Sequence, residues 1–303
     1  MTRPRIVFAG SPEFAALILR ELIAHADLTA VLTQPDRRAG RGLQHSASEV
    51  KKTAVAAGLP VWQPSTLGDA ETESRLAALA PDFLVTAAYG LMIPQALLDI
   101  PAVAALNVHP SLLPRWRGAA PIQRALLAGD QETGVSIMRM VAALDAGPVL
   151  AMRRCAIEPR DNSGTLRDRL ARLGSECLLA TLDAMLHGKA RETPQDGAQA
   201  SYAPKLSAAE RRIDWRQSAA HIERVVRAFA PSPGAYGSLR GTDHKILAAE
   251  IAGGAGTPGS ILAASPDGID VATGAGCLRI TCLQAPGKRA MSAAEFLRGK
   301  RAW

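Results

Sequence analysis

The sequence predicts a doubly wound α/β sheet followed by a small β-barrel. Apolar, strand-like runs alternate with amphipathic helical segments as far as residue 185, which is the pattern of a sheet covered by helices on both faces. The character changes near Gly188, where residues 188–201 are polar and typical of a linker. After Pro231, apolar residues recur at every second position between Gly-rich turns, which indicates short antiparallel strands.

The first element is a strand over residues 5–9 that ends at Gly10. Pro12 suits the first turn of a helix and Ser11 can cap it, so a helix over 12–25 follows. Further strands are expected at 28–33, 60–63, 82–87, 106–109, 133–141 and 148–157, and further helices at 49–57, 69–79, 95–98, 119–128 and 165–187.

Three local features complete this outline. The polar stretch 36–42 is expected to be a mobile loop, and Ser163 is expected to cap the long helix over 165–187. In the C-terminal part, a helix over 218–229 precedes strands joined by turns at 265–268 and 273–276. Doubly wound sheets bind ligands beyond the carboxyl ends of their strands. The loops of interest therefore follow Ala9, Thr33, Ala87, His109 and Leu144.

Composition excludes several classes of protein. Apolar residues make up 48% of the 303 residues and charged residues 21%, so the chain can bury a core and is neither disordered nor fibrous. The four cysteines are widely spaced, without CxxC or zinc-like spacing, which indicates reduced thiols and no metal site. No apolar run suits a signal peptide or a membrane span, so we expect a cytoplasmic protein that does not contact a membrane.

The charge of the chain is basic, with a formal net charge of +7. The larger share of the excess lies in residues 190–303 and includes Lys288 and Arg289. Such a surface is either simply solvated or binds a polyanion, and charge alone leaves both interpretations open.

Two strand-end residues have the chemistry of a catalytic site. Asn107 and His109 are two positions apart at the end of a predicted strand, so their side chains lie on one side. Two neutral or protonated donors aimed at one point can stabilise a developing oxyanion, although such a pair also occurs for purely structural reasons. Asp145, in the turn Leu144–Gly147, either stabilises its own turn or orients the His109 imidazole. The turn after the first strand, Gly10-Ser11-Pro12, is not GxGxxG, because Pro12 stands at the second glycine position. The sequence contains no Walker A motif, and Ser111 does not lie in a G-x-S-x-G elbow.

The run NVHPSLLPRWRGAAPIQ, from Asn107 to Gln123, resembles the signature of the folate-dependent formyltransferases, in the version that acts on a charged tRNA. The resemblance covers nearly the whole chain and continues in FAGSPEFA (8–15), TQPDRRAGRG (33–42), AAYGLMIP (87–94), ETGVSIMRM (132–140), LDAGPVL (144–150), SGTLRDRL (163–170), SYAPKL (201–206), RIDW (212–215) and AMSAAEFL (290–297).

The resemblance implies a Rossmann-like catalytic domain over residues 1–189, a linker over 190–205 and an OB-like, tRNA-binding barrel over 206–303. The implied reaction transfers a formyl group from 10-formyltetrahydrofolate to the α-amino group of methionyl initiator tRNA, without a metal. The product, N-formylmethionyl-tRNA, serves translation initiation. The protein is expected to be a monomer.

The resemblance also implies roles for individual residues. Asn107, His109 and Asp145 fall on catalytic positions. The folate-binding positions are Gly90, Leu91 and Met92, beside the pterin, and Ser111, Leu112, Leu113 and Pro114. The residues expected to contact tRNA are Arg37, Arg38 and Arg41 in the loop near the acceptor end, and Lys205, Lys288 and Arg289 in the C-terminal part. Leu43-Gln44-His45 stands where lysines are common, which makes Arg41 the expected anchor of that loop.

Two other classes remain as alternatives. One is a formyltransferase that acts on a small amine, such as glycinamide ribonucleotide or an amino sugar, although glycinamide ribonucleotide would not require a basic C-terminal barrel. The other is a nucleic-acid-binding protein with a vestigial α/β domain, which predicts no folate binding. Formyl transfer to charged initiator tRNA, compared with free methionine, distinguishes these possibilities.

Overall fold

The computed structural model describes residues 3–39 and 44–298, which form two compact units. The first unit comprises Met1–Pro121, Glu132–Ala156 and Arg167–Pro204, and the second comprises Ile122–Gln131, Ile157–Leu166 and Lys205–Trp303. Residues 190–204 are thus grouped with the first unit, and Thr193 exchanges two backbone hydrogen bonds with Val149. The functional boundaries at 189 and 205 stay a prediction.

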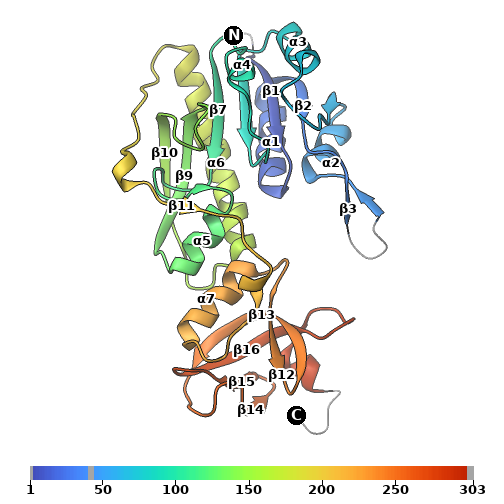
Figure 1. Ribbon diagram of the computed structural model, residues 1–303, viewed down its shortest axis with the longest axis vertical. Helices are drawn as coiled ribbons and strands as arrows, with labels where there is room; N and C mark the ends of the chain where they lie inside the picture. Colours follow the sequence, from blue (N-terminus) through green and yellow to red (C-terminus); the bar gives the residue numbers. More distant parts are fainter. Residues whose placement is uncertain (1–2, 40–43, 299–303) are drawn as a thin grey trace. The chain divides into compact units, whose positions relative to one another are not determined.

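The first unit is built on a seven-stranded mixed sheet (Figure 1). Its strands are β1 (Arg5–Gly10), β2 (Asp27–Leu32), β5 (Val61–Trp62), β6 (Phe83–Ala87), β7 (Ala104–His109), β9 (Glu132–Arg139) and β10 (Val149–Ala156), in the order β10-β9-β7-β6-β1-β2-β5. The strands from β5 to β7 in this order are parallel, whereas β9 is antiparallel to both of its neighbours. The predicted α/β class is confirmed.

Helices cover both faces of this sheet. They are α1 (Glu13–His25), α2 (Glu49–Ala56), α3 (Ala70–Ala78), α4 (Gln95–Leu98) and the part of α6 (Ser163–Leu186) that belongs to the first unit. A further helix, α5 (Pro121–Ala128), belongs to the second unit except for Pro121. On one face, Val7 of β1 belongs to a buried cluster with Leu76 of α3 and Leu97 of α4. On the opposite face, Gly174 brings the backbone of α6 close to Val108 of β7.

The long helix α6 begins earlier than predicted, and Ser163 is not its cap. The side chain of Asn162 accepts hydrogen bonds from the backbone N–H groups of Gly164 and Thr165, which is the role of an N-cap. Ser163 instead lies in the first turn and donates to the carbonyl oxygen of Ala230. Asn and Ser are about equally good caps, so the sequence alone did not distinguish these neighbours.

Two short pairings were not predicted. β3 (Arg37–Ala39) pairs with β4 (Gln44–Ser46) as an antiparallel ribbon, where a mobile loop over 36–42 was expected. Gly40, Arg41, Gly42 and Leu43 lie outside the described residues. β8 (Arg117–Gly118) pairs in parallel with β11 (Tyr202–Ala203), just beyond the short 3-10 helix η1 (Gly197–Gln199).

The second unit contains a six-stranded antiparallel sheet. Its elements are η2 (Ala209–Arg211), α7 (Ala219–Phe229), β12 (Ala235–Leu239), β13 (Thr242–Ala252), β14 (Ile261–Ser265), β15 (Gly268–Ala272), β16 (Cys277–Gln284), β17 (Met291–Ser292) and α8 (Ala293–Leu297). Ser218 caps α7 and the turns at 265–268 and 273–276 join β14, β15 and β16, so the predicted antiparallel β class is confirmed. The strand order is β12-β13-β16-β15-β14, with β17 on β16.

Among the described helices, none combines the length and the apolar character that a membrane-spanning helix requires. All four cysteines are free thiols.

The two edge strands of the seven-stranded sheet differ in character: β5 has only two residues, and β10 exposes Arg153 and Arg154.

Candidate active site

Strand β7 carries Asn107 and His109 at its carboxyl end, between β6 and β9. Asn107 is paired with Thr86 of β6, and His109 is paired with Ser136 of β9. Because successive side chains of a strand alternate, Asn107 and His109 share the face of the sheet that α3 and α4 cover. The predicted common direction of the two side chains is therefore present in the structure.

Asp145 lies in the turn between β9 and β10 and contacts both of these residues. Asn107 Nδ2 donates to Asp145 Oδ1 at 3.3 Å, and His109 Nδ1 lies 3.6 Å from Asp145 Oδ2. The side chains are shielded from solvent, with exposed fractions of 4% for His109 and 11% for Asp145. In such surroundings, charges interact more strongly than they do in water. The structure thus brings the three predicted catalytic residues together.

The backbone of the Asn107–Gly118 segment completes the site. The N–H of Gly118 donates to Asp145 Oδ2 at 2.7 Å, and the carbonyl oxygen of Trp116 lies 2.8 Å from His109 Nε2. A carbonyl oxygen can only accept, so Nε2 carries a hydrogen and Nδ1 is the ring atom left to exchange a proton with Asp145. At 3.6 Å the two groups are not yet hydrogen-bonded, and catalytic contacts often shorten only when substrate is bound.

The orientation of the Asn107 amide is set by Thr86. Thr86 Oγ1 donates to Asn107 Oδ1 at 2.9 Å, which turns the NH2 group of Asn107 towards Asp145. One N–H of that group contacts the Asp145 carboxylate, and the second N–H remains to bind a substrate oxygen. Thr86 is itself buried on β6, so this arrangement is rigid.

Asp145 has a left-handed backbone conformation, with φ +46°. Only a few per cent of residues other than glycine adopt such angles, and Asp is among the types that tolerate them. Strained backbone of this kind often accompanies function. Here it places the carboxylate against Gly118 and His109 instead of leaving it to cap its own turn.

The predicted folate loop follows β7 and is held by its own hydrogen bonds. Ser111 is fully buried, and its hydroxyl donates to the carbonyl oxygen of Arg115 at 2.6 Å. Ser136 of β9 donates to the Ser111 carbonyl oxygen and accepts from the N–H of Leu113. Leu112 lies over Gly134, where a Cβ atom would come within 2.5 Å of the leucine side chain. Ser111 therefore shapes the loop Ser111–Pro114, and folate contacts of this loop stay a prediction.

The second predicted folate segment, Gly90–Met92, follows β6. Ser11 and Gln34, from the loops after β1 and β2, both donate to the carbonyl oxygen of Tyr89. Burial raises the pKa of Tyr89 to about 12. Leu91 packs on the buried cluster beneath the segment, whereas Met92 has an exposed fraction of 64%. Loops from three strand ends thus meet beside Gly90–Met92.

The cationic residues expected to bind tRNA lie on separate segments. Arg37 and Arg38 belong to β3, whereas Arg41 lies outside the described residues. Lys205 is exposed in the second unit. Lys288 and Arg289 are exposed between β16 and β17, where Arg289 forms an ion pair with Glu295 at 2.8 Å. Contacts of these residues with nucleic acid stay a prediction.

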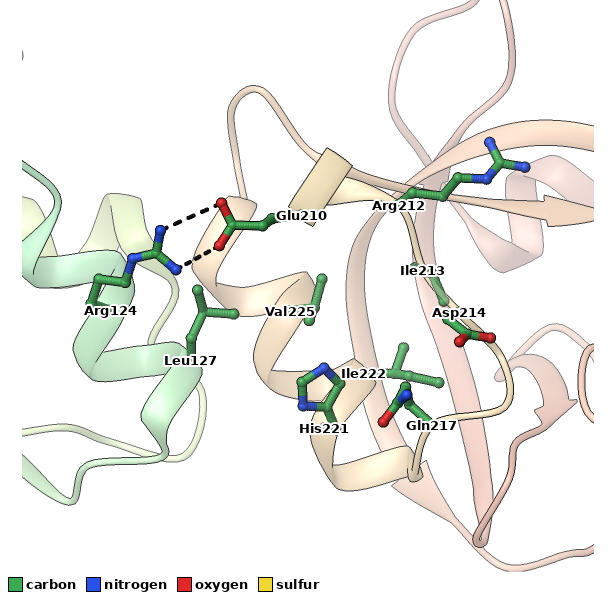
Figure 2. A pocket seen from close by; sticks show the side chains of 10 residues that line it. All are labelled: Arg124, Leu127, Glu210, Arg212, Ile213, Asp214, Gln217, His221, Ile222 and Val225. Atoms are coloured by element: carbon green, nitrogen blue, oxygen red, sulfur yellow. Dashed lines mark hydrogen bonds and ion pairs between the residues drawn. The ribbon is translucent and has the colours of Figure 1, made fainter. Parts of the chain in front are cut away.

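A groove of about 450 Å³ is lined by residues of the second unit (Figure 2). Leu127, Ile222 and Val225 supply apolar lining, and an ion pair between Arg124 and Glu210 lies at one end. Hydrogen bonds from Arg124 hold the pKa of Glu210 at about 2, so this pair stays charged over the physiological range. The groove contains none of the predicted catalytic residues.

Two family models match the chain, one in each of its two parts. A family model described as "Formyl transferase" matches residues 4–182, and one described as "Formyl transferase, C-terminal domain" matches residues 205–301. The chain belongs to the formyl transferase family. The resemblance found in the sequence is confirmed.

Relatives within the formyl transferase family match the chain over nearly its full length. This chain is 50% identical to the methionyl-tRNA formyltransferase of Pseudomonas paraeruginosa (strain DSM 24068 / PA7), over 98% of this chain and 96% of the relative. HypX from Aquifex aeolicus, solved in complex with tetrahydrofolic acid, has a TM-score of 0.66 at 20% identity over 98% of this chain and 47% of that one. This chain thus spans about half the length of HypX.

A second solved structure shares the fold. WlaRD, a sugar 3N-formyl transferase solved in the presence of dTDP and 5-N-formyl-THF, has a TM-score of 0.68 at 15% identity over 95% of this chain and 100% of that one. At these identities, the two solved structures show the formyl transferase fold alone. The comparison of activity rests on relatives with higher identity, such as the methionyl-tRNA formyltransferase of Pseudomonas paraeruginosa.

Some residues of this formyl transferase site were not predicted. The carbonyl of Trp116 and the N–H of Gly118 hold His109 and Asp145, and Thr86 orients Asn107. Trp116 and Gly118 belong to the sequence run that carries the resemblance, whereas nothing in the sequence marks Thr86.

Within residues 3–39 and 44–298, no group of three or more His, Cys, Asp or Glu side chains could hold a metal.

Proposed function

We propose that this formyl transferase moves a formyl group from 10-formyltetrahydrofolate to the α-amino group of methionyl initiator tRNA, which gives N-formylmethionyl-tRNA for translation initiation. The observation that carries the proposal is the 50% identity to a methionyl-tRNA formyltransferase across both the catalytic and the C-terminal family regions. The cluster of Asn107, His109 and Asp145 supplies the chemistry that formyl transfer needs.

The folate is a second substrate, and the loops Gly90–Met92 and Ser111–Pro114 are suited to hold it. Leu91 rests on a buried apolar cluster, and Met92 leaves an apolar side chain exposed next to it. An aromatic pterin needs such an apolar surface together with backbone hydrogen-bonding groups. When bound, the folate supplies an electrophilic formyl carbon.

Asn107 and His109 are placed to stabilise the negative charge that develops on the formyl oxygen. Asn107 has one N–H free of the Asp145 contact. The N–H of the neutral His109 ring is used by the Trp116 carbonyl, so His109 offers a donor to the formyl oxygen once Nδ1 also carries a proton. Donors held in place before the reaction need no reorganisation, and each contributes about 10²–10³ to the rate. The rigid attachments to Thr86 and Trp116 supply that preorganisation.

Asp145 and His109 would carry out the proton transfers that the reaction requires. The attacking α-amino group titrates near pH 7.7–8.0 in model compounds, so roughly a tenth or more of it is neutral at physiological pH. On attack, the amine must lose a proton and the departing nitrogen must gain one. His109 Nδ1 and Asp145 Oδ2 form the pair through which this proton can pass, directly or through water.

The C-terminal region is the proposed tRNA-binding part, and the ribbon β3–β4 is proposed to approach the acceptor end. Arg41, which lies between these two strands in the sequence, remains the expected anchor, since a guanidinium can bind phosphate through two hydrogen bonds or stack on a base. A tRNA substrate also implies a cytoplasmic location, and we keep the monomer as the proposed state. The proposed functional domains stay residues 1–189, 190–205 and 206–303, and the family matches at 4–182 and 205–301 support this division.

The test of this function is formyl transfer by the full chain. With 10-formyltetrahydrofolate as donor, we expect rapid formylation of methionyl initiator tRNA and no detectable formylation of free methionine. Glycinamide ribonucleotide and a nucleotide-linked amino sugar serve as competing acceptors. Faster reaction with either small amine would contradict the proposal in favour of a small-amine transferase, and folate binding without transfer would contradict it as well.

Affinity for tRNA should depend strongly on salt. Each phosphate that a lysine or arginine neutralises contributes about −0.7 to −0.9 to the slope of log K against log salt. Lys288 is exposed in the second unit, so Lys288→Gln should lower the size of that slope by about 1 if it contacts a phosphate. Filter binding or fluorescence titration from low to moderate salt measures the slope.

Arg20→Gln is the matched control for this titration. Arg20 is also exposed but forms an ion pair with Glu13 on α1, and we expect its loss to leave the slope unchanged. A wild-type affinity that does not change with salt would refute phosphate binding by this chain.

A further inference from the structure

Gln195 lies in the segment expected to be a linker, yet it is bound to the catalytic turn. Residues 191–194 and 196–199 are exposed, whereas Gln195 is half-buried. Its Nε2 donates to the carbonyl oxygens of Asp145 at 2.9 Å and of Gly147 at 2.7 Å. Both hydrogens of one amide group are thus used to hold Asp145 and Gly147, which lie in the same turn.

The other end of the Gln195 amide is held by Arg117. Nε and Nη2 of Arg117 donate to Gln195 Oε1 at 3.0 and 2.8 Å. Arg117 is a buried arginine, with an exposed fraction of 7%. Burying a guanidinium costs free energy unless its N–H groups are hydrogen-bonded. The Gln195 amide is neutral, so its position beside Arg117 is not explained by charge pairing. With Oε1 fixed by two donors, the amide cannot turn over, and its NH2 group must face the turn.

Arg117 is also joined to the catalytic residues through its neighbours in the chain. The carbonyl of Trp116 contacts His109, and the N–H of Gly118 contacts the Asp145 carboxylate. Segment 116–118 therefore touches the catalytic pair twice through its backbone and a third time through the Arg117 side chain and Gln195. These contacts close a ring that runs from Asp145 through Gly118, Arg117 and Gln195 back to Asp145.

We propose that Gln195, oriented by Arg117, is a positioning residue that fixes the backbone of Asp145 so that its carboxylate meets His109. The inference rests on the proposed formyl transfer and adds a residue that acts through Asp145. The Asp145 backbone is in the left-handed region, which is less favourable for an aspartate than an extended or helical conformation. Two hydrogen bonds from Gln195 to this turn offset that preference and keep the carboxylate against Gly118.

The experiment compares Gln195→Glu and Gln195→Met with the control Gln199→Ala in the full chain. Gln195→Glu keeps the size of the side chain and an acceptor for Arg117, but it replaces both N–H donors by an oxygen that repels the two carbonyls. We expect kcat to fall roughly 10- to 100-fold in both Gln195 variants, with KM for the folate changed less than about threefold. Gln199 is bonded to exposed Asp196, and Gln199→Ala should keep wild-type kcat.

A double-mutant cycle with Asp145→Asn tests whether Gln195 acts through Asp145. If it does, Gln195→Glu should lower kcat much less in the Asp145→Asn background than in the wild type, because the two effects share one cause. Equal losses in both backgrounds would overturn the proposal, as would wild-type kcat in Gln195→Glu.

Thermal unfolding separates positioning from simple support of the fold. We expect Gln195→Glu to stay folded, since Arg117 keeps its partner, and to melt only moderately below the wild type because of the repulsion by the two carbonyls. If Gln195→Met unfolds at a clearly lower temperature while Gln195→Glu remains fully active, Gln195 only anchors Arg117 and the proposal fails. Because wild-type formyl transfer is measured in the same series, an inactive wild type would show failure of the proposed function instead.

Discussion

His109→Ala is expected to lower kcat by about 10²–10³-fold while the KM for the folate stays within a few fold. His109 is buried, its ring is fixed by the Trp116 carbonyl, and Nδ1 faces Asp145. A group that acts only when charge develops contributes to the transition state and not to ground-state binding. Single-turnover formylation of charged initiator tRNA measures the chemical step directly.

Asn107→Ala should behave in the same way, because the Asn107 N–H that Asp145 does not use is proposed to bind the same formyl oxygen. The surface provides a matched control for His109. His187, the residue directly after α6, has Nδ1 3.3 Å from Oδ1 of Asp183 in that helix, so the two form another His–Asp pair in the same protein. His187→Ala should keep the wild-type kcat. Near-normal turnover in His109→Ala would remove this imidazole from the mechanism.

Asp145→Asn is expected to lower kcat by roughly 10²–10⁴-fold with little loss of stability. Asn also tolerates the left-handed backbone of this turn, so the fold should be kept. A carboxylate accepts at both oxygens, here from Asn107 and from Gly118, whereas an amide accepts at one atom only. The substitution therefore removes the negative charge beside His109 and disturbs the orientation of Asn107.

The measurement is the dependence of kcat/KM on pH together with thermal unfolding. If His109 and Asp145 act as a coupled pair, the profile of Asp145→Asn should differ in shape from that of the wild type. Asp183→Asn is the control, because its carboxylate faces an exposed histidine. Full activity with an unchanged profile would show that Asp145 only stabilises its turn.

Much of the fold follows from local patterns in the sequence. The strand expected at 5–9 is β1 (Arg5–Gly10), and the helix expected at 12–25 is α1 (Glu13–His25). Alternating or helical periodicity predicts these elements because each buries one face. The pairing of β8 with β11 could not be predicted in this way, since two-residue strands carry no periodicity and lie far apart in the chain.

In the candidate site, too, some features follow from the sequence and others are seen only in the folded chain. The spacing of Asn107 and His109 is enough to place both side chains on one face of a strand. The approach of Asp145 depends on the antiparallel return of β9 and β10, which only the folded sheet shows. The Trp116 carbonyl and the Gly118 N–H are backbone groups, so side-chain chemistry does not mark them, although the positive φ of Gly118 favours glycine there. The same holds for Gln195, which is a single polar residue in a polar stretch.

The edge strands of the seven-stranded sheet bear on how this protein behaves at high concentration. An edge strand presents unpaired N–H and carbonyl groups, which can recruit a strand from another molecule and start aggregation. β5 offers only two residues for such pairing, and β10 carries exposed Arg153 and Arg154. A second copy of β10 added there would bring these guanidinium groups close together, although Arg154 already has Glu132 as an ion-pair partner. At one end, the backbone of Val149 is already hydrogen-bonded to Thr193. Both edges therefore oppose continuation of the sheet into a fibre, which helps an enzyme with long apolar strands to remain dispersed.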